Sequence, residues 1–136
     1  MAHVNTPVAE RYGLVRRLDR GVTGTVIEWL AAHPEHRERL TLCPVNLSGQ
    51  SPGEPDLLRF VERCYTSTGM LPRKICFEMT EAAAIAEITR ATRFIEALRR
   101  LGCRFALDDF GSGLCSFAYL TSLPVDYLEI RWLLRA

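Results

Sequence analysis

The feature that constrains this chain most is an alternation of strand-like and helix-like segments, which repeats about every thirty residues. Apolar runs that predict buried strands lie at 40–45, 75–79, 103–107 and 127–130. Apolar residues at helical spacing precede or separate these runs at 15–33, 55–65 and 85–101, and a short helix is expected at 116–120. Because such alternation is typical of parallel βα units, we predict an α/β fold with about four βα units of parallel sheet.

Composition limits the class of protein. The 136 residues include 17 lysines and arginines and 16 aspartates and glutamates, and 48% are hydrophobic. This balance predicts one folded domain over residues 1–136 and excludes a strongly basic partner of nucleic acid polymers. No window has the roughly 18 consecutive apolar residues of a membrane helix. The first residues also lack the basic and apolar regions of a secretion signal, so we expect a cytoplasmic chain without a membrane partner.

The five cysteines are odd in number and form no C-x-x-C pair. They lie mostly within apolar runs, which favours reduced, buried thiols over disulfides or a zinc site. We therefore do not count the cysteines among the candidate functional residues.

Polar residues gather where the predicted strands end. Asn46 follows the first strand, Glu78 lies in the second with Glu81 just after it, and Asp108 and Asp109 follow the third. In parallel α/β folds the carboxyl ends of the strands share one face, and that face carries the chemistry. One amide and four carboxylates are hard oxygen ligands of the kind that hold Mg²⁺ or Mn²⁺. The sequence therefore predicts a divalent metal site on this face.

Each of these residues also has a purely structural interpretation. An Asp-Asp-Phe-Gly segment after a strand is often only a turn whose aspartate caps the next helix. Asn46 could hydrogen-bond its own loop. Glu78 is harder to explain in this way, because an unpaired carboxylate between Phe77 and Met79 in an apolar strand is costly. Asp108 and Asp109 would point to opposite faces of a regular strand, so they share a site only if the strand curls there.

Other motifs fail on their context. The tripeptide Asp109-Phe-Gly111 matches part of the protein kinase pattern, but no glycine-rich loop, His-Arg-Asp or strand lysine accompanies it. The His33-x-x-His36 pair lacks the glutamate of a zincin helix and is interpreted as a solvated helix end. Arg99 and Arg100 are interpreted as a solvated helix face.

A set of spaced motifs resembles the EAL-domain family of bacterial cyclic di-GMP phosphodiesterases. The matching pieces are Pro7-Val-Ala-Glu-Arg-Tyr-Gly-Leu14, Val45-Asn-Leu-Ser48, Glu78-Met-Thr-Glu81, Leu107-Asp-Asp-Phe-Gly-Ser-Gly113, Tyr119-Leu120 and Leu123-Pro-Val-Asp126. The resemblance implies a modified TIM-type (β/α)8 barrel in which two divalent metals activate a water that opens cyclic di-GMP to linear pGpG. It also implies that Asn46, Glu78, Asp108 and Asp109 are metal ligands, and that Glu81 steadies the loop after Asp109.

The chain departs from the family pattern in length and in detail. A complete barrel has eight strands and roughly 200 to 250 residues, whereas the four strands here resemble the third to sixth. The Glu-Ala-Leu segment itself is missing. The family's Leu-Lys-Ile-Asp reads Leu128-Glu-Ile-Arg131 here, and its Gly-Thr-Gly-Tyr-Ser-Ser reads Gly111-Ser-Gly-Leu-Cys-Ser116.

These departures predict a partial barrel, truncated at both ends, that does not turn over cyclic di-GMP on its own. Weak metal or cyclic di-GMP binding would then remain. The alternative is a noncatalytic protein-interaction module in second-messenger signalling. Because an unclosed sheet leaves two edges without partners, we also expect a homo-oligomer.

Overall fold

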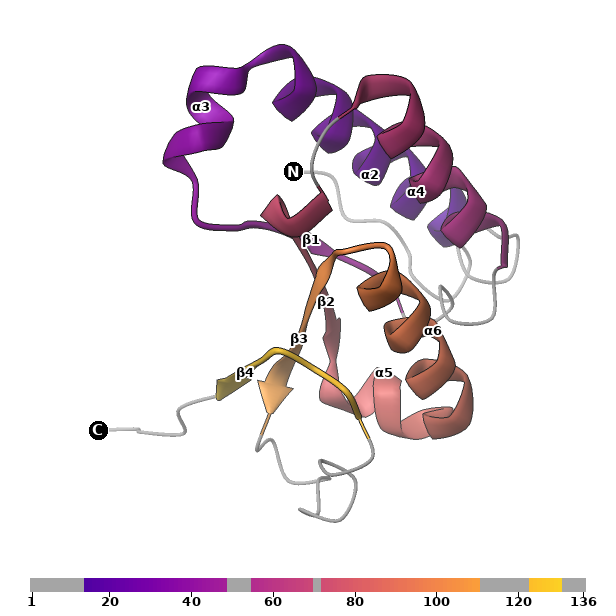
Figure 1. Cartoon of the computed structure of the whole chain (residues 1–136). Coiled ribbons are helices and arrows are strands. Elements are labelled where there is room, and N and C mark those ends of the chain that lie inside the picture. The colour runs from indigo at the N-terminus through magenta and orange to yellow at the C-terminus, as the bar shows by residue number, and fades with distance from the viewer. Residues whose placement is uncertain (1–13, 49–54, 70–71, 111–122, 131–136) are drawn as a thin grey trace.

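The structure, a computed structural model, describes residues 14–48, 55–69, 72–110 and 123–130. It confirms the predicted α/β architecture: four strands form one sheet in the order β1-β2-β3-β4, and every neighbouring pair is parallel (Figure 1). The elements are α2 (Leu14–Ala32), α3 (Pro34–Arg39), β1 (Cys43–Asn46), α4 (Pro55–Thr68), the short 3-10 turn η2 (Pro72–Lys74), β2 (Ile75–Thr80), α5 (Glu81–Ala86), α6 (Ile88–Arg100), β3 (Arg104–Phe110) and β4 (Tyr127–Ile130).

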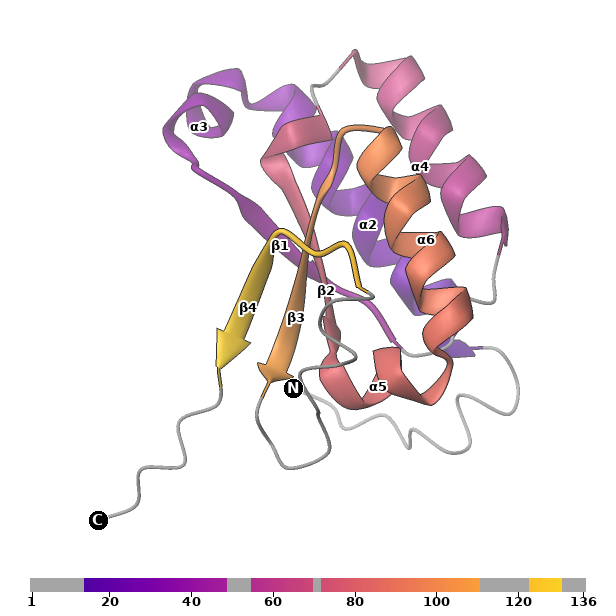
Figure 2. The same ribbon diagram turned by 60° about the horizontal axis from the view of Figure 1, so that its bottom comes forward.

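The helices α2, α4 and α6 lie together on one side of the sheet, as both views show (Figures 1 and 2). Alternate residues of the two central strands pack in the core, among them Phe77 and Phe105, which are fully buried. The Phe105 ring meets the Phe94 ring of α6 edge to face, with 6.5 Å between the centroids. Since strand side chains alternate between faces, the residues between these core positions belong to the other face of the sheet.

Helix ends agree with the local sequence. Thr80 caps α5, because its Oγ1 accepts a hydrogen bond from the backbone N–H of Ala83 at 3.2 Å. Helix α6 ends before Gly102, whose φ of 101° is a conformation that favours glycine. The backbone N–H of Cys103 donates to the carbonyl of Leu98, as expected when a helix closes on a glycine.

The boundaries differ from the prediction at three places. Strand β1 begins at Cys43 rather than at residue 40, and the helix expected over 85–101 is divided into α5 and α6 at Glu87, where φ is −140°. Strand β3 continues to Phe110, so Asp108 and Asp109 lie within the strand and not in a loop after it. The reason is that β3 keeps pairing with β4 as far as Phe110 and Ile130. The helix expected at 116–120 lies outside the described residues.

The described cysteines Cys43, Cys64, Cys76 and Cys103 are free thiols, and all but Cys43 are buried, as predicted. Burial raises the pKa of Cys76 to about 12 and that of Cys103 to about 11. Cys115 lies outside the described residues. Among the described helices, none combines the length and the hydropathy that crossing a membrane requires.

Candidate metal centre

Strand register brings the polar residues of the sheet to one face. Asn46 at the end of β1 is in register with Glu78 of β2, and Glu78 is in register with Ala106 of β3. Neighbours in register project to the same face of a sheet, which is also the face of every second residue along each strand. Asp108 lies two residues beyond Ala106, and therefore shares the face of Asn46 and Glu78.

An irregularity between β3 and β4 lies at the two aspartates. Leu107 is in register with Leu128, and Phe110 with Ile130. Asp108 and Asp109 together thus oppose the single residue Glu129, which is the arrangement of a β-bulge. The strand does not curl out at the two aspartates, but the bulge breaks the regular alternation of side chains there. The side chain of Asp109 lies outside the part of the chain that the structure describes.

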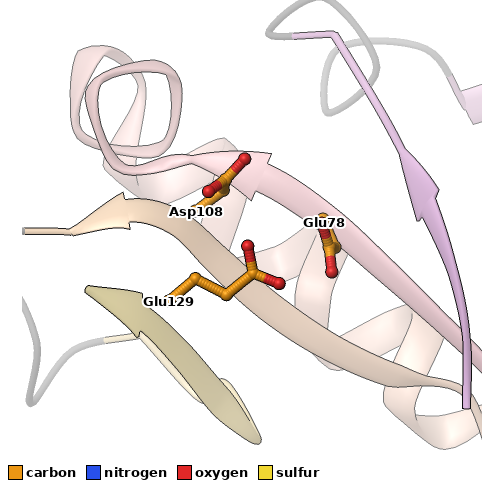
Figure 3. A group of neighbouring side chains, drawn as sticks. All are labelled: Glu78, Asp108 and Glu129. Carbon is orange, nitrogen blue, oxygen red and sulfur yellow. The ribbon is translucent and has the colours of Figure 1, made fainter. Parts of the chain in front are cut away.

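Three carboxylates meet at this point. One carboxylate oxygen each from Glu78, Asp108 and Glu129 lie within 4.8 Å of one another, and Figure 3 shows the three side chains converging from β2, β3 and β4. We call these residues the carboxylate cluster. Glu78 and Asp108 are half-buried and Glu129 is exposed, so the cluster is open on one side. Side-chain carboxylates at this separation can bind one divalent cation between them.

Electrostatics within the carboxylate cluster favour a bound proton or cation. The pKa of Glu129 rises to about 7, first because its protonated carboxyl shares a hydrogen bond with Glu78. Partial burial, a second hydrogen bond with Asp108 and repulsion from both neighbouring carboxylates raise the pKa further. Below about pH 7 the cluster therefore favours a proton on Glu129, which a divalent cation would displace.

Two other predicted site residues lie on neighbouring elements, Asn46 on β1 and Glu81 on α5. Asn46 is exposed at the end of β1, in register with Glu78. Glu81 begins α5 directly after β2, and only 1% of its surface is exposed. Among the described residues, Glu78, Asp108 and Glu129 form the group whose spacing suits a metal, so Glu81 occupies a separate position.

Glu129 is the residue that sequence reasoning did not assign to the site. The sequence shows it as an acid in place of the family's lysine, which leaves open whether it replaces a ligand or disrupts the site. Arg131, two residues later, lies outside the described residues. No local sequence signal assigns it, because Glu129 reaches this face through the pairing of β4 with β3, in which Tyr127 is in register with Ala106. The turn interpretation of Asp108 is not supported, because Asp108 lies inside β3.

The chain belongs to the EAL domain family, whose model matches residues 3–132. This finding confirms the resemblance drawn from the motifs. Solved EAL domains have a TIM-barrel fold, and the four parallel strands here correspond to part of it.

Known proteins similar to this chain include phosphodiesterases and solved EAL domains. The chain is 36% identical over 122 residues to the cyclic di-GMP phosphodiesterase PdeB of Shewanella oneidensis, covering 90% of this chain and 14% of PdeB. The Pseudomonas aeruginosa FimX EAL domain bound to cyclic di-GMP is 29% identical with a TM-score of 0.81, covering 92% of this chain and 49% of that one.

A second solved structure shows the fold alone. Klebsiella pneumoniae BlrP1, solved as a manganese and cyclic di-GMP complex, is 23% identical with a TM-score of 0.69, covering 84% of this chain and 29% of that one. The chain thus spans about half of the solved FimX domain and a smaller share of the other two.

Proposed function

We propose that this chain carries a divalent metal site of a cyclic di-GMP phosphodiesterase, in which Glu78, Asp108 and Glu129 bind Mg²⁺ or Mn²⁺. The observation that carries this proposal is the convergence of the three carboxylates within 4.8 Å on one face of the sheet. Asn46 and Asp109 are proposed as further ligands, since Asn46 is in register with Glu78 and the backbone of Asp109 forms part of the bulge opposite Glu129.

The chemistry of the donor set fits such a metal. Carboxylate and amide oxygens are hard ligands that suit Mg²⁺ and Mn²⁺, and no thiol or imidazole belongs to the carboxylate cluster. Glu78 and Asp108 raise the pKa of Glu129, so the cluster concentrates negative charge that a divalent cation would neutralise. The cyclic di-GMP complex of the FimX EAL domain supports the same nucleotide for this chain.

The side chains have distinct tasks in this proposal. A bound divalent metal supplies a water of lowered pKa and neutralises charge on the phosphodiester oxygens. Glu78 and Asp108 anchor the metal from the two central strands. Glu129 adds a third negative charge where the resembled family pattern has a lysine, and so strengthens the attraction for the cation. Glu81, buried at the start of α5, is proposed as a positioning residue for the segment after Asp109.

We propose that the chain by itself binds cyclic di-GMP weakly and does not hydrolyse it at a useful rate. The described strands provide few side chains to fix two metals and a substrate together, and productive geometry needs most ligands in place. The nucleotide is an intracellular messenger in the resembled family, so the chain is proposed to act in the bacterial cytoplasm.

Calorimetric titration with MnCl₂ tests the metal site. The wild-type chain should bind Mn²⁺ with saturation, and Glu78→Gln or Asp108→Asn should weaken binding about 10- to 100-fold. The matched control is Glu62→Gln, which removes an exposed carboxylate of α4 away from the cluster. Equal binding by all four proteins would refute the site.

A second experiment tests turnover. Cyclic di-GMP is incubated with Mn²⁺ and the chain, and the products are separated by chromatography. Formation of pGpG that Asp108→Asn abolishes would contradict the proposed inactivity.

A second candidate function is self-association as a noncatalytic module, and one observation favours it. Helix α2 exposes the large apolar side chains Leu14, Leu18, Val22 and Trp29 at helical spacing, each at 42% to 51% exposure. A second copy of the chain could cover this stripe and the sheet edges, which in the described part of the chain have no partner strand. Light scattering at micromolar concentration should give a mass above one chain, and Val22→Glu should lower it. A monomeric wild-type chain would contradict self-association.

A further inference from the structure

We propose that a pocket at the amino-terminal ends of the strands binds a polyphosphate group, presented as pyrophosphate or as part of a nucleoside triphosphate. The pocket has a volume of about 500 Å³ and is lined by four arginines, which are Arg73, Arg99, Arg100 and Arg104. We call it the arginine pocket. Arg73 lies just before β2 and Arg104 begins β3, whereas Asp108 of the carboxylate cluster lies near the other end of β3. The two sites are therefore separate.

The charge of the arginine pocket is positive. Its lining has two acids, Glu96 and Asp126, against four arginines. Asp126 is already engaged, because its Oδ2 accepts the backbone N–H of Phe105 at 2.9 Å and its Oδ1 lies 3.3 Å from Arg99 Nη2 and 4.0 Å from Arg104 Nη1. With only 11% of its side chain exposed, Asp126 holds Arg99 and Arg104 side by side. An anion in the pocket would meet guanidinium groups that are already positioned.

Arginines at the end of a helix usually have a simpler explanation, which is pairing with the last carbonyls. Here backbone N–H groups pair with carbonyls at the end of α6 instead. The N–H groups of Leu101 and Cys103 both donate to the carbonyl of Leu98, and the N–H of Gly102 donates to that of Arg99. The side chain of Arg100 makes no hydrogen bond or ion pair with the rest of the described chain. Its donors are available to a ligand.

Arg73 joins the pocket because two turns pack closely. The turn after α6 passes through Gly102, where an added Cβ would lie 3.1 Å from Cγ of Pro72. The lack of a side chain at Gly102 thus lets the turn lie close to Pro72 of η2, and the next residue, Arg73, lines the pocket together with Arg100 and Arg104. Within the described residues, Arg73 also has no hydrogen-bonded or ionic partner for its side chain. Its neighbour Lys74, in contrast, donates to the Leu40 carbonyl at 2.6 Å.

The four guanidinium groups of the arginine pocket favour a ligand that contains phosphate. Each planar guanidinium offers paired N–H donors that match two oxygens of one phosphate. Four such groups around one pocket suit an anion with several linked phosphates better than a single carboxylate. A volume of about 500 Å³ is also within the range of small-molecule sites.

Calorimetric titration of the metal-free chain with sodium pyrophosphate, in the presence of a chelator, tests the proposal. The chelator prevents binding through a metal on the carboxylate cluster, so failure here and failure of the metal site are distinguishable. We expect saturable binding with one site per chain. Arg73→Gln and Arg100→Gln should each weaken it about five- to tenfold, because each removes one charged donor group. Neither residue pairs with Asp126, so both variants should fold.

Arg93→Gln is the matched control, because Arg93 is an exposed arginine of α6 that does not line the arginine pocket. Its affinity for pyrophosphate should stay within about twofold of wild type. Absence of saturable binding up to about 10 mM pyrophosphate would overturn the proposal, as would an equal loss in Arg93→Gln.

A second titration with adenosine triphosphate distinguishes the source of the phosphate. Tighter binding than pyrophosphate indicates a nucleotide ligand, and equal or weaker binding indicates an inorganic one.

Discussion

The carboxyl groups of Glu78 and Glu129 approach within 4.8 Å of each other although a whole strand, β3, lies between their own strands. The residue of β3 in register with Glu78 is Ala106, which is also in register with Tyr127 of β4. Because alanine is small, two long side chains can meet above it. We therefore expect the carboxylate cluster to depend on a residue that carries no charge.

Ala106→Leu is therefore predicted to weaken Mn²⁺ binding about tenfold or more without changing any ligand. The larger side chain would occupy the space across which Glu78 and Glu129 meet. Calorimetry measures the affinity, and circular dichroism checks that the variant still folds, since Ala106 is only 2% exposed. Ala106→Gly is the control and should bind nearly as well as wild type. Undiminished binding by a folded Ala106→Leu would contradict this account of the cluster.

The affinity for Mn²⁺ should rise between about pH 6 and about pH 8. The metal must displace the proton held by Glu129, whose pKa is raised to about 7, and that proton leaves as the pH passes this value. Glu129→Gln should bind more weakly at pH 8 and should show a smaller change with pH. Calorimetry at several pH values in buffers matched for ionic strength checks this. An unchanged pH profile in Glu129→Gln would contradict the assignment of the proton.

The metal-free chain should show the opposite dependence in its stability. The folded-state pKa of Glu129 lies above its unfolded value, so its contribution to stability is complete below the unfolded pKa and is lost as the pH rises through about 7. The melting temperature with a chelator present should thus fall between about pH 5 and about pH 7 and level off above that. In Glu129→Gln the fall should be smaller, and a fall of equal size would show that other groups cause it.

Saturating Mn²⁺ should raise the melting temperature of the wild-type chain. A ligand that binds only the folded state at 100 times its dissociation constant adds about 2.7 kcal/mol to the unfolding free energy. Differential scanning fluorimetry with and without MnCl₂ measures the shift. Asp108→Asn should lose most of it, and Glu62→Gln should retain it. An equal shift in Asp108→Asn would mean that the metal binds elsewhere.

Two glycines should respond in opposite ways to replacement by alanine. Gly102 has a φ of 101°, and a Cβ there would approach Pro72 Cγ to 3.1 Å, so Gly102→Ala should cost about 1 to 3 kcal/mol of stability. Gly21 lies within helix α2 with nothing within 4 Å of an added Cβ, so Gly21→Ala should stabilise by about 0.5 to 1 kcal/mol. Urea denaturation followed by circular dichroism measures both. Equal effects would contradict the distinction.

The sequence predicts the fold well because the signals for strands and helices are local. The alternation of apolar runs was sufficient to predict four parallel βα units, and the glycine at 102 marked the end of α6. The division of a predicted long helix at Glu87 was missed, since the apolar spacing continues across that point. Helical spacing alone does not show where a helix bends.

The candidate site was predicted in part. Glu78 and Asp108 followed from their places along the strands, and the structure brings them together. Glu129 was not assigned, because its position depends on how β4 pairs with β3 and on the bulge between Leu107 and Phe110. Pairing between strands about twenty residues apart is a tertiary property that local patterns do not encode.

The alternation of side chains across the sheet separates two kinds of evolutionary change. Substitutions at positions such as Phe77 and Phe105 alter the contacts with the helices and hence the survival of the fold. Substitutions at Glu78, Ala106 or Glu129 act mainly on what the opposite surface can bind. A lineage can therefore exchange a basic residue for an acid on that surface, and acquire a different ligand preference, while inheriting the same scaffold.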